Sequence, residues 1–268
     1  MTVIRLATAL FLVLLPATAQ AHRAWLLPSA TVLSGDEAWI TVDAAISNEL
    51  FYFEHHPLLL EGLSIVGPKG TEIAPQNEST GKYRSTFDIE LKEPGTYKLA
   101  VAGDGLFASY EVNGERKRWR GKPENLSKEI PDGAEKLTVT QSQRRLETYA
   151  TLGAPSKEAL ETTGKGLELA PITHPNDLFA GEEAQFKLLV DGEPAPNVEV
   201  SIIRGGNRYR DTLGEIKVTT GEDGSFAVTW PEPGMYWLEA SATDGKTTID
   251  KATERRLGYV ATLEVLPE

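Results

Sequence analysis

The sequence predicts an all-β protein made of two β-sandwich domains. Three observations carry this prediction: apolar residues mostly alternate with polar ones in short runs, Gly- and Pro-rich words separate the runs, and few segments show helical periodicity. Short strands at this spacing are typical of sandwiches. The 268 residues contain no cysteine, so we expect each core to be stabilised by burial alone.

Residues 1–21 are predicted to be a secretory signal peptide. The segment carries one positive charge in MTVIR, a short apolar run, ALFLVLL, and the small-residue pattern Ala19-Gln20-Ala21. The apolar run is shorter than the roughly 20 residues that span a bilayer. We therefore expect cleavage after Ala21, export to a bacterial periplasm, and no transmembrane segment in the mature chain.

The charge balance excludes some partners. Cleavage removes one of the 27 basic residues, Arg5, and none of the 39 acidic ones, so the net charge of −12 becomes −13. This argues against nucleic acid or an anionic membrane surface as a partner and is compatible with cations.

The N-terminal β-sandwich domain is expected to cover residues 22–152. Alternating runs predict strands at 39–43, 83–89 and 96–101. Residues 114–135 are polar and rich in Gly and Pro, and we expect a long loop or an excursion from the sheet there. Its basic word, Arg116 to Arg120, favours a solvated hairpin; the alternative is a patch for an acidic partner, with Trp119 at the interface.

The C-terminal domain is expected to cover residues 166–268, after a linker at 153–165. Runs at 185–190, 198–203 and 225–230 predict its strands.

The two halves of the chain contain a similar sequence segment. Residues 93–105 read EPGTYKLAVAGDG and residues 232–245 read EPGMYWLEASATDG. In each half the Pro-Gly word sets a turn before an alternating strand, and one more alternating segment follows. We expect each domain to close with a similar terminal hairpin; the alternative is chance recurrence of a common turn word.

The four histidines are the candidate metal ligands. Cleavage after Ala21 would make His22 the first residue, so its free α-amine and its imidazole Nδ1 could close a chelate ring on a metal ion. A second imidazole would complete a histidine brace, a planar set of three nitrogens that suits copper(II) best and nickel(II) next. Before cleavage the backbone nitrogen is an amide and the brace cannot form.

The other histidines supply the partner ring. His55 and His56 follow an aromatic run, and at most one of them is expected to share a planar site with His22, because adjacent extended residues face opposite ways. His174 lies in the loop that opens the second domain. We take His22, His55 and His174 as the candidate ligands. The alternatives are exposed loop residues at 55 and 56 and a turn histidine bonded to backbone at 174.

The sequence also resembles a known family. The segments AHRAWLLPSATVLSGD, YRSTFDIELKEPGTYKL, GLELAPITHPNDLFAGEEAQFKLLVDGEPAPNVEV and EDGSFAVTWPEPGMYWLEA are similar to the periplasmic domain-of-unknown-function family 4198, which has been called NikM-like and associated with nickel uptake. The resemblance implies a mature start at or near His22, an N-terminal β domain and a C-terminal immunoglobulin-like domain. The matching histidines are His22 and His174.

The expected function is therefore binding of one copper or nickel ion by an exported protein. An envelope transporter or a TonB-dependent receptor is the protein partner considered. We expect no enzyme, because the chain lacks a Gly-x-Ser-x-Gly elbow, a His-Glu-x-x-His motif, a phosphate loop and a cysteine nucleophile. The alternatives are a docking module that binds no metal and a copper-dependent oxidative enzyme of the histidine-brace type.

Overall fold

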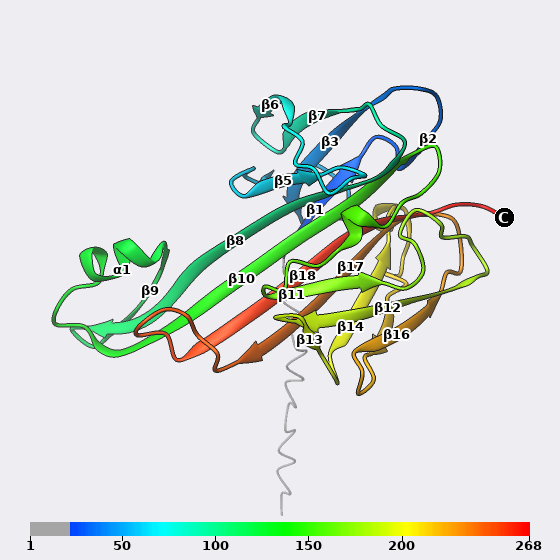
Figure 1. The fold of residues 1–268 in the computed structure, drawn as a ribbon. Helices are drawn as coiled ribbons and strands as arrows, with labels where there is room; N and C mark the ends of the chain where they lie inside the picture. The colour runs from blue at the N-terminus through cyan, green and yellow to red at the C-terminus, as the bar shows by residue number, and fades with distance from the viewer. Residues whose placement is uncertain (1–21) are drawn as a thin grey trace, which may run out of the picture.

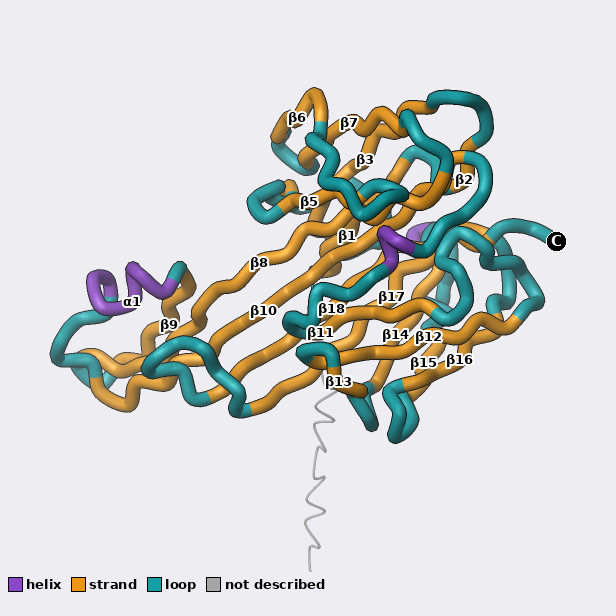
Figure 2. Tube along the Cα trace, in the orientation of Figure 1, coloured by secondary structure: helices purple, strands orange, loops and turns teal. Residues whose placement is uncertain are grey.

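The structure, a computed structural model, describes residues 22–268, and the predicted signal peptide lies outside the described residues. Among these described residues strands dominate, with one short α-helix, α1 (Pro123–Glu129), and two 3-10 turns, Glu158–Leu160 and Asn207–Tyr209 (Figure 2). The all-β sandwich prediction is confirmed. Within the described part, no helix is long and apolar enough to cross a membrane.

The strands form three sheets. The first sheet contains β1 (Arg23–Pro28), β3 (Ala38–Ser47), β4 (His56–Pro57), β6 (Gln76–Thr80) and β7 (Ser85–Leu91). The central sheet contains β2 (Val32–Leu33), β5 (Leu63–Val66), β8 (Gly95–Val112), β9 (Glu115–Gly121), β10 (Glu135–Leu152), β14 (Glu199–Arg204), β15 (Ile216–Thr219), β17 (Gly234–Asp244) and β18 (Glu254–Val265). The third sheet contains β11 (Leu167–Pro171), β12 (Glu183–Val190), β13 (Glu193–Pro194) and β16 (Ser225–Thr229).

The first and third sheets cover opposite faces of the central sheet (Figure 1). Strand alternation explains how: β17 buries Trp237 in the core beneath the first sheet, and Tyr236 and Leu238 in the core beneath the third. The two sandwiches join where β10 runs parallel to β18, from Thr140 opposite Glu254 to Thr148 opposite Thr262. The central sheet therefore belongs to both sandwiches.

Each sandwich has the strand arrangement of an immunoglobulin fold. In the C-terminal one, β11, β12 and β16 form one sheet and β15, β14, β17 and β18 the other, corresponding to strands A-B-E and C′-C-F-G. In the N-terminal one, β1, β3 and β7 face β5, β8 and β10 in the same way. The predicted linker, residues 153–165, lies between β10 and β11 and includes the first 3-10 turn.

The repeated EPG words form the same local structure in both sandwiches. The Tyr97 hydroxyl donates a hydrogen bond to the carbonyl of Glu93 at 2.9 Å, and the Tyr236 hydroxyl donates to the carbonyl of Glu232 at 2.7 Å. A tyrosine near the start of strand F that bonds backbone a few residues upstream is the tyrosine corner of immunoglobulin-like domains. The strands that follow, β8 and β17, pair antiparallel with β10 and β18. The C-terminal sandwich therefore closes with the predicted hairpin. In the N-terminal sandwich the predicted second segment, residues 107–112, continues β8 instead, and β9 and α1 separate β8 from β10.

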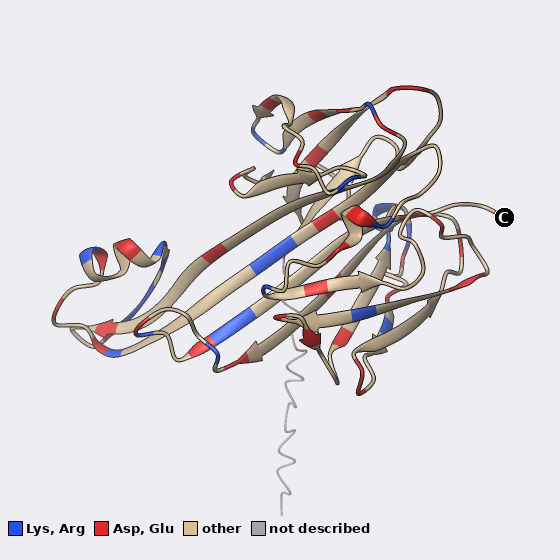
Figure 3. Cartoon of the chain, viewed as in Figure 1, with Lys and Arg blue, Asp and Glu red and all other residues tan. Residues whose placement is uncertain are grey.

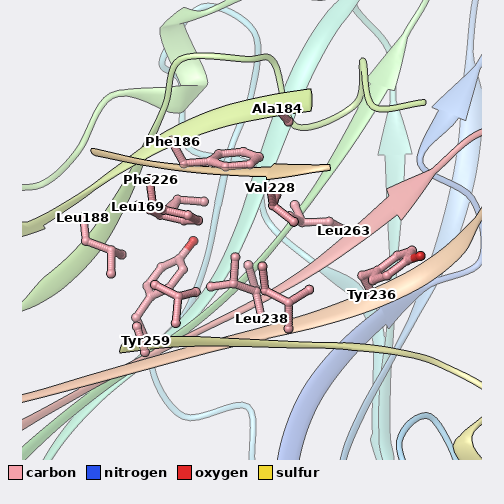
Figure 4. Close-up of a cluster of buried hydrophobic side chains, with 14 of the residues drawn as sticks. Leu169, Ala184, Phe186, Leu188, Phe226, Val228, Tyr236, Leu238, Tyr259 and Leu263 are labelled. Atoms are coloured by element: carbon pink, nitrogen blue, oxygen red, sulfur yellow. The ribbon is translucent and has the colours of Figure 1, made fainter. Parts of the chain in front are cut away.

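Aromatic side chains fill both cores. In the core beneath the third sheet, Phe186 stacks on Phe226 with ring centroids 5.5 Å apart (Figure 4). In the same core, Trp230 meets Tyr236 edge-on at 5.0 Å. Such aromatic pairs contribute about 0.5–1.5 kcal/mol each beyond the area they bury.

The loop predicted at residues 114–135 is wrong, because this segment forms β9 and α1. Two apolar residues of the segment, Leu126 and Ile130, lie one helical turn apart and bury against Leu106, Ala108 and Val139 of β8 and β10. Two apolar residues among many charges are too few to show helical periodicity. The basic word lies on β9 with its Arg and Lys side chains exposed, as the solvated-hairpin interpretation predicts.

Candidate functional site

Three of the four histidines gather at one end of the first sheet. His22 directly precedes β1, whose first residue, Arg23, pairs with Ser47 at the end of β3. On the other side of β3, Ile46 pairs with His56 in β4. Because Ile46 and Ser47 are neighbours on β3, the two pairings bring the start of β1 and the start of β4 to the same place.

The imidazole rings are in contact. The rings of His22 and His55 stack with centroids 3.9 Å apart and an interplanar angle of 11°, and the rings of His55 and His56 lie 4.6 Å apart at 44°. All three side chains are exposed. Partial desolvation, followed by the neighbouring charges of His22 and His56, lowers the pKa of His55 below its usual value, although Glu54 acts in the opposite direction.

The loop before His55 is fixed by hydrogen bonds. The Glu54 carboxylate accepts hydrogen bonds from the backbone N–H groups of Asn48 and Glu49 at 2.8 and 3.0 Å. The Ser47 hydroxyl donates to the carbonyl of Glu49 at 2.6 Å and accepts from the Trp25 indole at 3.0 Å. The position of His55 is therefore tied to the core through β1 and β3.

Aromatic packing anchors the same loop. Trp25 is fully buried, and its ring meets those of Phe51 and Phe53 at 5.5 and 5.4 Å. The N–H of Leu50 donates to the Asn207 side chain at 3.1 Å, which ties the loop to the second 3-10 turn. The aromatic run before the histidines thus serves to pack the loop that presents them.

The structure places His174 apart from this cluster. Its Nε2 lies 2.9 Å from the Thr96 hydroxyl and 3.2 Å from the Ser156 carbonyl, and its Nδ1 accepts a hydrogen bond from the N–H of Asn176 at 3.1 Å. Both ring nitrogens are therefore already in use. Burial lowers the pKa of His174, while its bond to the Ser156 carbonyl acts in the opposite direction.

His174 lies near the opposite end of β1 from His22. Its partner Thr96 pairs with Thr151, and Thr151 pairs with Val32, which follows the C-terminal end of β1. The six residues of β1 separate that end from His22, a span of about 20 Å at 3.3 Å per residue. The position of His174 gives no support to a shared site with His22, and its bonds match the alternative of a turn histidine bonded to backbone.

A metal site requires ligand atoms that converge on one point. Over residues 22–268, no three His, Cys, Asp or Glu side chains converge as a ready ligand set. The rings of His22 and His55 are stacked almost parallel, so their in-plane lone pairs do not point at a common position. In the uncut chain the backbone nitrogen of His22 is an amide, which is not available as a ligand. The rings of His22 and His55 are therefore in contact, but the described residues do not form an assembled set of three ligands.

Sequence reasoning identified His22 and His55 but missed the residues that bring them together. Glu54, which orders the loop, looked like one of many surface acids. Its only signal was its place directly before the His-His pair, and the hydrogen bonds it accepts depend on how the loop folds back.

The chain was compared with solved structures, curated proteins and family models, and only the family model identifies what it belongs to. Solved structures similar to the chain include the D0-D1 domain of intimin, at 12% identity, 90% coverage of this chain, 97% of that chain and a TM-score of 0.24. A two-domain fibronectin type III segment of chicken tenascin matches at 11% identity, with coverages of 91% and 100% and a TM-score of 0.22. A marsupial T cell receptor matches at 9% identity, with coverages of 92% and 74% and a TM-score of 0.21. A search of curated proteins finds no match.

The family profile described as a domain of unknown function, DUF4198, matches residues 19–244, and these residues include both sandwiches up to the end of β17 as well as all four histidines. The chain belongs to the DUF4198 family.

Proposed function

We propose that this chain is exported to the periplasm, is cut after Ala21, and binds one copper or nickel ion through His22 and His55. The observation that supports this most directly is the ring contact at 3.9 Å between two histidines far apart in the sequence. An envelope transporter or a TonB-dependent receptor would deliver the ion or receive it.

The chemistry follows from the freed terminus. Cleavage would convert the amide nitrogen of His22 into an amine that chelates together with Nδ1 of the same residue, and rotation of the exposed ring would turn both toward His55. Three nitrogens in a plane suit copper(II) and then nickel(II). The lowered pKa of His55 helps, because a proton competes less for the ring at neutral pH. His56, in contact with His55, is the alternative third ligand.

The test compares two forms of the protein. One begins at His22, and the other carries a single alanine before His22, so they differ only in whether the amine belongs to a histidine. We expect the first to bind copper(II) with submicromolar affinity, measured by calorimetry, and to show nitrogen hyperfine structure in its electron paramagnetic resonance spectrum. The second should bind at least about tenfold more weakly, since it loses the chelate.

Single variants identify the third nitrogen. We expect His55→Ala to weaken copper binding and His174→Gln to leave it unchanged. If the form with the extra alanine binds as tightly as the form that begins at His22, the brace is wrong. If His56→Ala rather than His55→Ala removes the affinity, the ligand is the neighbouring ring.

A further inference from the structure

A groove opens beside the histidine cluster, where the first sheet ends and the central sheet continues. Its volume is about 720 Å³, in the range of small-ligand sites. The long strands β8 and β10 form the floor, the chain from His56 to Leu59 forms one wall, and Arg120 of β9 lies at the far side. Figure 1 shows β8 and β10 extending well beyond the first sheet.

The floor of the groove contains two glycines, Gly103 and Gly105 of β8, where nothing in the fold requires glycine, and a third, Gly258, lies beside Arg144 outside the groove lining. Arg144 of β10 is flanked by Gly103 on β8 and by Gly258 on β18, and Ser142 is opposite Gly105. A Cβ added at Gly103 would meet no atom within 4 Å, and at Gly258 it would meet only the Arg144 side chain, at 3.8 Å. None of the three glycines has a positive φ. Glycine inside a strand costs about 0.5–1 kcal/mol relative to alanine and often marks close approach of a ligand.

Arg144 has no ion-pair partner in the described chain, although the more distant Glu239 carboxylate partly compensates its charge. Its neighbour Arg145 lies 3.3 Å from Glu147, and Arg256 lies 2.7 Å from Glu254. By contrast, no carboxylate among residues 22–268 lies within 4.0 Å of the Arg144 guanidinium. Figure 3 shows basic segments in the middle of β10 and near the start of β18.

Burial lowers the pKa of Arg144; the charge of Glu239 raises it and that of Arg120 lowers it. A half-buried guanidinium near a second one is an unfavourable arrangement, and Glu239 compensates Arg144 only from beyond 4.0 Å, so an anion between Arg144 and Arg120 would stabilise the pair.

The remaining lining groups fit a small organic anion. Arg120 lies over the ring of Phe107 at 5.1 Å, and both line the groove. Two acids also touch the lining, but Asp104 alternates with Gly103 and Gly105 and so faces the other side of the sheet, and Glu61 is paired with Lys122. The groove therefore combines two guanidinium groups with an aromatic face.

We propose that the groove binds a small di- or tricarboxylate, with Arg144 and Arg120 holding a carboxylate group and Phe107 contacting the carbon skeleton. A guanidinium holds a carboxylate through two parallel hydrogen bonds, a geometry that lysine does not offer. The glycine floor leaves room for the ligand. This site does not require a metal at the histidines.

The test uses the metal-free protein beginning at His22, in buffer containing a chelator that is removed before titration. Succinate, citrate and inorganic phosphate are titrated by calorimetry, and the melting temperature is followed. We expect at least one of the two carboxylates to bind and to raise the melting temperature. Arg144→Gln should weaken that binding at least about tenfold, as loss of a charged hydrogen-bond pair does.

Two further variants separate the site from general charge and from folding. Arg256→Gln makes the same charge change on the same sheet outside the groove, and it should bind as wild type does. Gly103→Val keeps the charge but fills the floor, and it should fold normally and bind weakly. The proposal is overturned if neither carboxylate binds, if Arg144→Gln or Gly103→Val binds like wild type, or if only phosphate binds. None of these outcomes affects the copper titration, because no metal is present.

Discussion

The surroundings of His174 favour the neutral form of its ring. Nδ1 accepts a backbone hydrogen bond from Asn176, so the proton of the neutral ring lies on Nε2, which can donate to the Ser156 carbonyl. Burial lowers the pKa of His174 from the usual 6.5, whereas the unfolded chain has no such burial. As the pH falls, the unfolded chain therefore binds the proton first, so the stability that His174 contributes is present above its usual pKa of 6.5 and is lost as the pH falls below it.

We predict that His174→Gln lowers the free energy of unfolding at pH 7.5 by about 1–2 kcal/mol, through loss of buried hydrogen bonds. The same variant should reduce the difference in urea midpoint between pH 7.5 and pH 5. His56→Gln, which replaces an exposed histidine, is the matched control and should retain the wild-type difference. An unchanged pH difference in His174→Gln would show that other groups carry it.

At the scale of single elements, the two tyrosine corners stabilise equivalent turns to different extents. The Tyr97 hydroxyl both donates to the Glu93 carbonyl and accepts from the Glu93 N–H at 3.0 Å, whereas the Tyr236 hydroxyl makes only the donor bond to Glu232 within the described chain. We predict that Tyr97→Phe lowers the free energy of unfolding by about 1–3 kcal/mol and Tyr236→Phe by about 0.5–1.5 kcal/mol, since each bond contributes about 1 kcal/mol. Urea unfolding measures both, and equal losses would contradict the difference in bonding.

The sequence predicted the strands, whose pattern is local, but not helix α1, whose burial depends on distant strands. The six alternating runs all form strands, from residues 39–43 within β3 to residues 225–229 as β16, because alternation of apolar and polar residues matches the two-residue period of a strand. Helix α1 was missed because its two buried anchors, Leu126 and the C-cap residue Ile130, are recognisable only once β8 and β10 are in place.

The candidate site was likewise predicted only in part. His22 and His55 were chosen from residue chemistry, and the structure brings their rings together because β1 and β4 pair with neighbouring residues of β3. Arg144 gave no signal, since one arginine in a strand has ordinary chemistry until the glycines on two neighbouring strands are aligned beside it. That alignment depends on the pairing of β10 with β18, which are distant in the chain.

At the scale of the whole molecule, each core is completed by strands from both halves of the chain. Ile203, Trp237 and Val260 of the C-terminal half are buried in the core beneath the first sheet, and Tyr149 of the N-terminal half is buried in the other core. Tyr259 of the C-terminal half links the two halves directly. Its hydroxyl and that of Tyr149 both donate hydrogen bonds of 2.8 Å to the Glu147 carboxylate. Unfolding one sandwich would therefore expose apolar surface and unpaired polar groups of the other.

We predict that the two sandwiches unfold together in one cooperative transition. Phe186→Ala, a cavity-forming change in the core beneath the third sheet, should lower the free energy of unfolding by about 3–5 kcal/mol and move the single calorimetric transition as a whole. Tyr209→Ala is the matched aromatic control, because Tyr209 is 86% exposed and its loss should leave the transition where it is. Two separate transitions, with only one shifted by Phe186→Ala, would mean that the seam between β10 and β18 opens before either core is lost, and that the shared central sheet does not couple the two halves.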